Sequence, residues 1–364
     1  MRFAFKMICV LSLALPAAAQ VPTPGQGTTA QRERPAPRQP TFDFHNNFWV
    51  NLHHFIYQQA RLRGQSAANA PAPATPASTG AGATLPVANH LVAVPGLASL
   101  DGLSDEERLA WNEAVEYYAG ALANRDLLFD GDMVNINNRL AEWEKQPDVS
   151  QSGLRAPLIA ALSKAAPVYR AHWWPEHDRV NREWIGVMDP RVRQTGPALL
   201  ARLAVVYQAQ WPAANIWVDV SHYAGRVGAY TSDDPLHVTI SSADPRNQGD
   251  SGFEILFHEA SHGLTRHVEE AIARECRARN KPIPRDLWHA VLFYTTGEVV
   301  KRVLAEEQLR KGAGAQTYTP YAYREGLYAR AWPRFQPLLE THWQAYLDGK
   351  LEFDRAIARI VNAL

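Results

Sequence analysis

Apolar positions follow a helical period over most of the first 210 residues. In LSDEERLAWNEAVEYYAGAL, residues 103–122, Ser104 stands at the expected N-cap and Glu107 follows three residues later, which predicts a capping box. We therefore expect a helical N-terminal lobe over residues 41–212. Its other helical runs are residues 41–63, 155–170 and 195–210.

The periodicity changes after Trp211-Pro212. Residues 215–225 and 235–244 are β-branched and aromatic, and turn residues separate them, so they predict two strands of a small sheet. From residue 253 onward the pattern is helical again, with breaks at 280–285 and 311–316. The chain is therefore expected to be α+β and mainly α-helical, in one compact unit with a second region over 213–364.

Two stretches lack any periodic pattern. Residues 20–40 are rich in proline, glycine and glutamine and predict a disordered tether, and residues 65–88 predict a flexible loop within the N-terminal lobe.

The first nineteen residues have the layout of a secretory signal peptide. Arg2 and Lys6 precede a short apolar run, and Ala17-Ala18-Ala19 offers a cleavage site before Gln20. The apolar run is too short to span a bilayer permanently, and no later stretch approaches that length. We expect a periplasmic or secreted protein without stable membrane insertion.

Charge and cysteine content exclude some functions. Lys+Arg and Asp+Glu number 37 each, so the balance gives no case for a nucleic-acid partner. After signal cleavage Cys276 is the single cysteine, which excludes an intramolecular disulfide.

The stretch FEILFHEASHGL, residues 253–264, carries the chemistry. His258 and His262 stand at i and i+4 on one helical face, about 6 Å apart, so both imidazoles can reach one metal ion. Both lie roughly 120–160° from the apolar stripe of this helix, which argues against a role in core packing. Glu259 stands beside the first histidine, where it can take a proton from a zinc-bound water. The pattern is the H-E-x-x-H signature of zinc hydrolases.

A third protein ligand is required, and it must come from another element. Position 268 is Val, and Glu269 and Glu270 lie about 10–12 Å further along the same helix. If residues 253–278 and 286–307 form an antiparallel helical hairpin, residue 298 comes within one turn of His262. Glu298 is therefore the expected third ligand of Zn²⁺, and Gly297 beside it would allow close helix approach. Glu306 and Glu307 are the reserve candidates.

At this point the chain resembles the gluzincin-type zinc metallopeptidases. The resemblance rests on HEASH, a downstream Glu and the preceding strand PLHVTISS, and it covers roughly residues 213–310. The resemblance implies a zincin-like region over 213–364, with a strand along the active-site cleft and a peptide or protein substrate. The separation of His262 and Glu298 is longer than in the best-known members.

A donor that stabilises the transition state is expected opposite Glu259. Tyr321 and Tyr323 are the first candidates, because they follow a Gly-rich break and can fold back over the site. Tyr294 is an alternative, and His289 ranks last because it falls on the opposite side of its helix from Glu298.

Four further histidines stand among aromatic residues and are expected to have packing or rim roles. They are His53, His54, His172 and His177.

The sequence as a whole predicts an exported zinc metallohydrolase, with a peptidase as the first choice. Two alternatives stay open, a metal-binding protein without catalysis and a zinc hydrolase of a non-peptide amide or ester.

Overall fold

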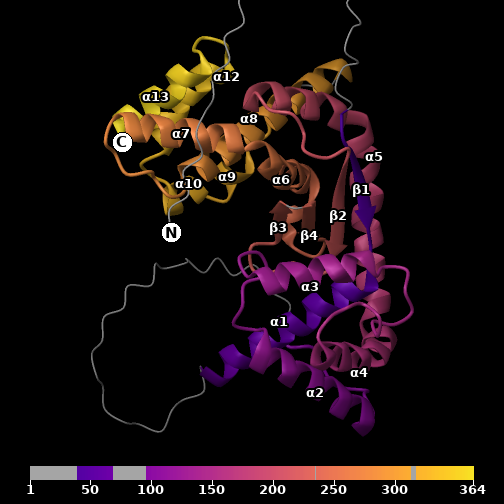
Figure 1. Ribbon diagram of the computed structural model, residues 1–364. Coiled ribbons are helices and arrows are strands. Elements are labelled where there is room, and N and C mark those ends of the chain that lie inside the picture. Colours follow the sequence, from indigo (N-terminus) through magenta and orange to yellow (C-terminus); the bar gives the residue numbers. More distant parts are fainter. Residues whose placement is uncertain (1–38, 69–95, 234, 313–316) are drawn as a thin grey trace, which may run out of the picture. The chain divides into compact units, whose positions relative to one another are not determined.

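The computed structural model describes residues 39–68, 96–233, 235–312 and 317–364. The predicted signal peptide, nearly all of the predicted tether 20–40 and most of the predicted loop 65–88 lie outside these ranges. The described residues form a mainly helical α+β fold with a small four-stranded mixed sheet, as the sequence predicted (Figure 1). None of the described helices combines the length and the apolar character that crossing a membrane requires.

The sheet has the strand order β1-β2-β4-β3. The first three of these strands are parallel, and β3 pairs with β4 in the antiparallel direction. Every residue of β4 is buried, because the strand is central and its β-branched side chains pack on both faces. The strands are β1 (Thr41–His45), β2 (Asn215–Ser221), β3 (Ala229–Asp233) and β4 (Leu236–Ser241).

Two of these strands were expected and two were not. β2 and β4 confirm the strands predicted at 215–225 and 235–244. β1 corrects the helical interpretation of residues 41–63, since TFDFH alternates with period two and only the following residues form a helix. β3 was missed because its five residues stand among turn residues.

Four helices pack around a separate apolar cluster that includes Trp111, Tyr118 and Tyr169, and they are called the N-terminal lobe below. The capping box at Ser104 and Glu107 is present, with both reciprocal hydrogen bonds. The helices are α1 (Phe48–Ala68), α2 (Asp105–Ala121), α3 (Gly131–Glu142) and α4 (Ala156–His172).

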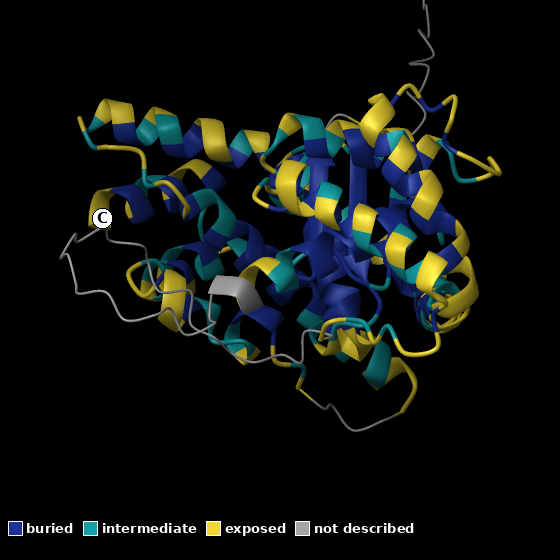
Figure 2. Cartoon of the chain, turned by 90° about the horizontal axis from the view of Figure 1, so that it is seen from below, coloured by how far each residue is buried: buried dark blue, intermediate teal, exposed yellow. Residues whose placement is uncertain are grey.

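The long helix α5 (Trp174–Tyr207) joins the lobe to the second region. Its first turns contact the lobe, where His177 packs against Phe55, and its last turns pack with the sheet, α6 and α8. Figure 1 shows α5 running alongside β1. In Figure 2 the buried residues gather on the sheet and on the inward faces of the helices.

The remaining helices follow the sheet. Residues 249–261 form α6, a 3₁₀ turn η2 follows at His262–Leu264, and the chain then continues as α7. The C-terminal helices are short until α13, which packs against α7. The elements are η1 (Pro245–Asn247), α6 (Gly249–Ser261), α7 (Arg266–Ala278), α8 (Leu287–Arg310), α9 (Tyr321–Arg324), α10 (Leu327–Ala331), α11 (Gln336–Leu338), the π-helical turn η3 (Leu339–Trp343), α12 (Gln344–Leu347) and α13 (Phe353–Ala363).

Candidate metal centre

Helix α6 and the turn that follows it supply two histidines on one face. Every residue of α6 from Ser251 to Ser261 is buried, so the helix lies within the core. His258 is 2% exposed, and His262 opens η2 directly after α6. The centres of their imidazole rings lie 5.2 Å apart.

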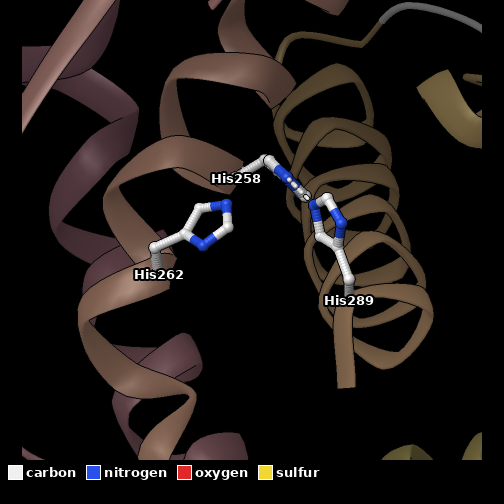
Figure 3. Close-up of side chains that lie close together, drawn as sticks. All are labelled: His258, His262 and His289. Atoms are coloured by element: carbon white, nitrogen blue, oxygen red, sulfur yellow. Dashed lines mark hydrogen bonds between the residues drawn. The ribbon is translucent and has the colours of Figure 1, made fainter. Parts of the chain in front are cut away.

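The third member of the group is His289 on α8. Its Nε2 lies 3.3 Å from Nε2 of His258, and its ring centre lies 5.4 Å from that of His262. One ligand nitrogen from each histidine falls within 4.8 Å of the others, and Figure 3 shows the three rings converging from the two helices. This group can hold a metal ion.

The spacing suits a tetrahedral ion. Zinc binds imidazole nitrogens at about 2.0–2.1 Å, which places two ligands of a tetrahedron about 3.4 Å apart. The distance between His258 and His289 is 3.3 Å. The His262 nitrogen lies within 4.8 Å of both of these nitrogens.

Burial keeps the three imidazoles neutral, which is the form that binds metal. Burial lowers the pKa of His262 to about 3 and that of His289 to about 4, and it lowers the pKa of His258 well below its usual range. The neighbouring histidines lower the pKa of His258 and His262 further. Metal binding would therefore displace few protons at neutral pH.

Glu298 lies elsewhere, and this corrects the expected ligand set. Residues 253–278 were expected to form one helix, but α6 ends at Ser261, the turn η2 interrupts it, and α7 packs mainly on α13. Only α6 therefore pairs with α8 at the site. His258 lies beside His289 and Phe293, and Glu254 lies beside Gly297.

This register moves residue 298 away from the histidines. Nine residues separate His289 from Glu298, which is about 13–14 Å along a helix. The carboxylate of Glu298 instead pairs with Lys301 Nζ at 3.0 Å. The reserve candidates are also engaged elsewhere, Glu306 with Arg202 and Glu307 with Lys311.

Glu259 lies at the group, as expected for a general base. Its side chain is 9% exposed, and Oε2 lies 3.8 Å from Nε2 of His262. The same oxygen accepts a hydrogen bond from Thr231 Oγ1 on β3 at 2.8 Å. The motif helix and the antiparallel strand of the sheet thus place one carboxylate beside His262.

Aromatic rings enclose the group on the side of α8. Phe293 stacks on His258 with ring centres 3.8 Å apart, and Trp288 stacks on His289 at 4.9 Å. Trp332 from the C-terminal segment approaches His289 at 5.5 Å. This enclosure explains the low exposure of the imidazoles.

The tyrosine candidates do not reach the histidines directly. Tyr321 stacks on Phe293, 6.1 Å from ring centre to ring centre, and burial raises its pKa to about 12. Tyr323 donates its hydroxyl to Glu340 at 2.8 Å, and Tyr294 donates to Gln344 at 2.8 Å. Tyr321 is therefore the nearer of the two first candidates, one ring layer behind Phe293.

The four histidines expected to have packing or rim roles form hydrogen bonds within and around the N-terminal lobe. His53 contacts the hydroxyl of Tyr118, His54 that of Tyr230, and His177 that of Tyr169, at 2.8–2.9 Å. His172 lies 3.0 Å from a carboxylate oxygen of Glu107.

Comparisons of the chain with family models, with curated proteins and with solved structures found no match. The case for a function therefore rests on the geometry of the site.

Proposed function

We propose that the protein is a zinc-dependent metallohydrolase, with peptides as the first candidate substrates. One observation supports the proposal. The ligand nitrogens of His258, His262 and His289 lie within 4.8 Å of one another, and the Glu259 carboxylate lies 3.8 Å from His262. Three protein ligands leave a fourth position of tetrahedral zinc for water or substrate, which is the arrangement of catalytic sites.

When bound, zinc supplies a Lewis acid that polarises a carbonyl group and acidifies a water molecule. Glu259 would accept the proton of that water at its carboxylate and return it to the leaving nitrogen. The 3.8 Å between Glu259 and His262 keeps the carboxylate close to the ligands without making it one of them. The aromatic wall of Trp288, Phe293 and Trp332 would exclude bulk water from one side.

The donor set favours zinc over hard cations. Imidazole suits zinc, copper, iron and nickel, whereas magnesium and calcium prefer oxygen ligands. His258, His262 and His289 offer nitrogen alone.

The gluzincin resemblance supports the peptide substrate but not the ligand set, because His289 takes the place that the resemblance gives to a glutamate. The strand expected along the cleft also changes. β4 pairs with β2 on one side and β3 on the other, so its backbone has no edge left for a peptide. β3 ends the sheet beside α6 and η2, and it is the strand that would receive an extended substrate.

Periplasmic or extracellular action stays part of the proposal and rests on residues 1–19 alone. A metal-binding protein without catalysis is the main competitor, and a hydrolase of non-peptide amides or esters is the second.

The test compares wild type with Glu259→Gln in metal content and in hydrolysis of peptide, amide and ester panels. Both proteins should hold about one zinc, and the variant should lose hydrolysis by a factor of roughly 100 to 10,000. Glu270→Gln, at an exposed position of α7, is the matched control and should behave as wild type. Surviving hydrolysis in Glu259→Gln refutes the mechanism. Zinc without hydrolysis of any panel by the wild type supports the non-catalytic competitor.

A further inference from the structure

Thr231 on β3 contacts Glu259 twice. Its Oγ1 lies 2.8 Å from the carboxylate oxygen Oε2 and 2.9 Å from the backbone carbonyl oxygen of the same residue. Thr231 is 6% exposed and Glu259 is 7% exposed, so this contact is sheltered from water. The strand and the motif helix meet at this hydroxyl.

A threonine hydroxyl carries one proton and cannot donate to both oxygens at once. The Glu259 carbonyl already accepts the backbone N–H of His262 at the end of α6. An ionised carboxylate is the stronger acceptor, because hydrogen bonds to charged groups are shorter and about twice as strong. The Thr231 proton therefore points to Oε2.

We propose that Thr231 is a positioning residue that holds the carboxylate of Glu259 in one orientation, an inference that rests on the function proposed above. Thr231 donates its hydroxyl proton to Oε2 of Glu259. No covalent bond to Thr231 is made or broken.

The Thr231 hydroxyl lies 2.8 Å from Oε2, which is an ordinary hydrogen-bond distance, so the contact limits rotation of the carboxylate. A general base must keep one orientation toward the group that gives up its proton, because a displacement of about 1 Å costs roughly 100-fold in rate.

The strand gives this hydroxyl a fixed direction. Thr231 pairs with Val238 of β4, and a β-branched side chain in a strand has restricted χ1 rotation. Valine has nearly the same shape and the same preference for strands, so Thr231→Val removes the hydroxyl and little else. Thr231→Ser keeps the hydroxyl and is the matched control.

The experiment measures zinc content, kinetics and the infrared carboxylate bands of wild type and both variants. We expect equal zinc in all three proteins. Thr231→Val should lower kcat by about 10- to 100-fold with KM within about threefold, since it removes orientation and not binding. Thr231→Ser should remain within about threefold of wild type.

The infrared bands provide a readout that does not depend on activity. The carboxylate band of Glu259, assigned by its loss in Glu259→Gln, should shift in Thr231→Val and not in Thr231→Ser. An unshifted band with unchanged kcat overturns the inference, as does a loss of zinc with a matching rise in KM, which would show a structural role. If the wild type hydrolyses nothing while the band still shifts, the proposed function fails but the hydrogen bond to Glu259 stands.

Discussion

His289 Nε2 lies 3.3 Å from His258 Nε2, although 31 residues separate the two in the sequence. Two neutral imidazoles can share at most one hydrogen between these nitrogens, so the contact by itself is a single neutral hydrogen bond. A third imidazole stands within 4.8 Å of both. A metal ion would bind one nitrogen of each of the three rings at once, so the close contact of His258 and His289 favours metal binding.

Replacing His289 with alanine should abolish tight zinc binding. We expect the affinity to fall by more than about 100-fold, since changes to groups that only support a metal ligand already cost roughly 10- to 100-fold. Competition with a chromophoric chelator measures the affinity, and circular dichroism checks that α8 stays folded.

Glu298→Gln is the matched comparison on the same helix. Glu298 pairs with Lys301 and not with the histidines. The Glu298→Gln protein should therefore bind zinc with the affinity of the wild type. If both variants lost zinc affinity equally, Glu298 would also be a metal ligand.

The motif residues were predictable because their spacing is local. An i, i+4 pair on a helix fixes its own geometry, so His258, Glu259 and His262 could be placed together from the sequence. The capping box at Ser104 was predictable for the same reason.

The role of His289 was not predictable, because the residue of α8 that faces His258 and His262 depends on where α6 ends. The break follows Ser261, and a signal for it was present in Gly263, where a Cβ atom would meet Pro212 at 2.9 Å. The close approach to Pro212 and Leu236 is a tertiary contact that the sequence pattern does not contain. Treating residues 253–278 as one helix shifted the pairing with α8 and selected Glu298 instead of His289.

Glu254 should make stability depend on pH. It is fully buried one turn before His258, and Oε2 accepts hydrogen bonds from the Tyr318 hydroxyl at 2.8 Å and the Tyr321 N–H at 2.9 Å. Burial raises its pKa to about 7, although these hydrogen bonds oppose the rise. Between the ordinary value of 4.5 and about 7, the folded chain binds more protons at this residue than the unfolded chain.

This difference in bound protons sets the direction in which stability changes with pH. The free energy of unfolding contributed by Glu254 is highest at acid pH, falls as pH rises through this window, and stays low above it. Relative to wild type, Glu254→Gln should therefore gain roughly 3 kcal/mol in unfolding free energy from pH 4 to pH 8. Urea denaturation of both proteins across this range measures the difference. A difference that does not change with pH would contradict the raised pKa.

Gly297→Ala should destabilise the junction between α6, α8 and the segment before α9. A Cβ atom at this position would lie 2.7 Å from Pro320 Cβ and 3.2 Å from Glu254 Oε1. We expect a loss of about 1–3 kcal/mol, typical of an overpacked site.

Gly186→Ala is the matched control, since Gly186 lies within α5 with no atom within 4 Å of its added Cβ. This change should raise stability by about 0.5–1 kcal/mol through helix propensity. Denaturant midpoints of the two variants measure both effects, and equal midpoints would show that Pro320 moves aside freely.

The pairing of β1 with β2 joins two segments that lie far apart in the sequence. Thr41 pairs with Asn215, 174 residues later, and the helices of the N-terminal lobe fill the interval. Contacts between such distant positions form slowly, because closing a long loop of chain costs entropy before any contact compensates for it. A folded lobe shortens the free chain between the two strands. The lobe is therefore expected to form first. The rate at which β1 pairs with β2 would then depend on the residues of the lobe, which lie far from the histidines.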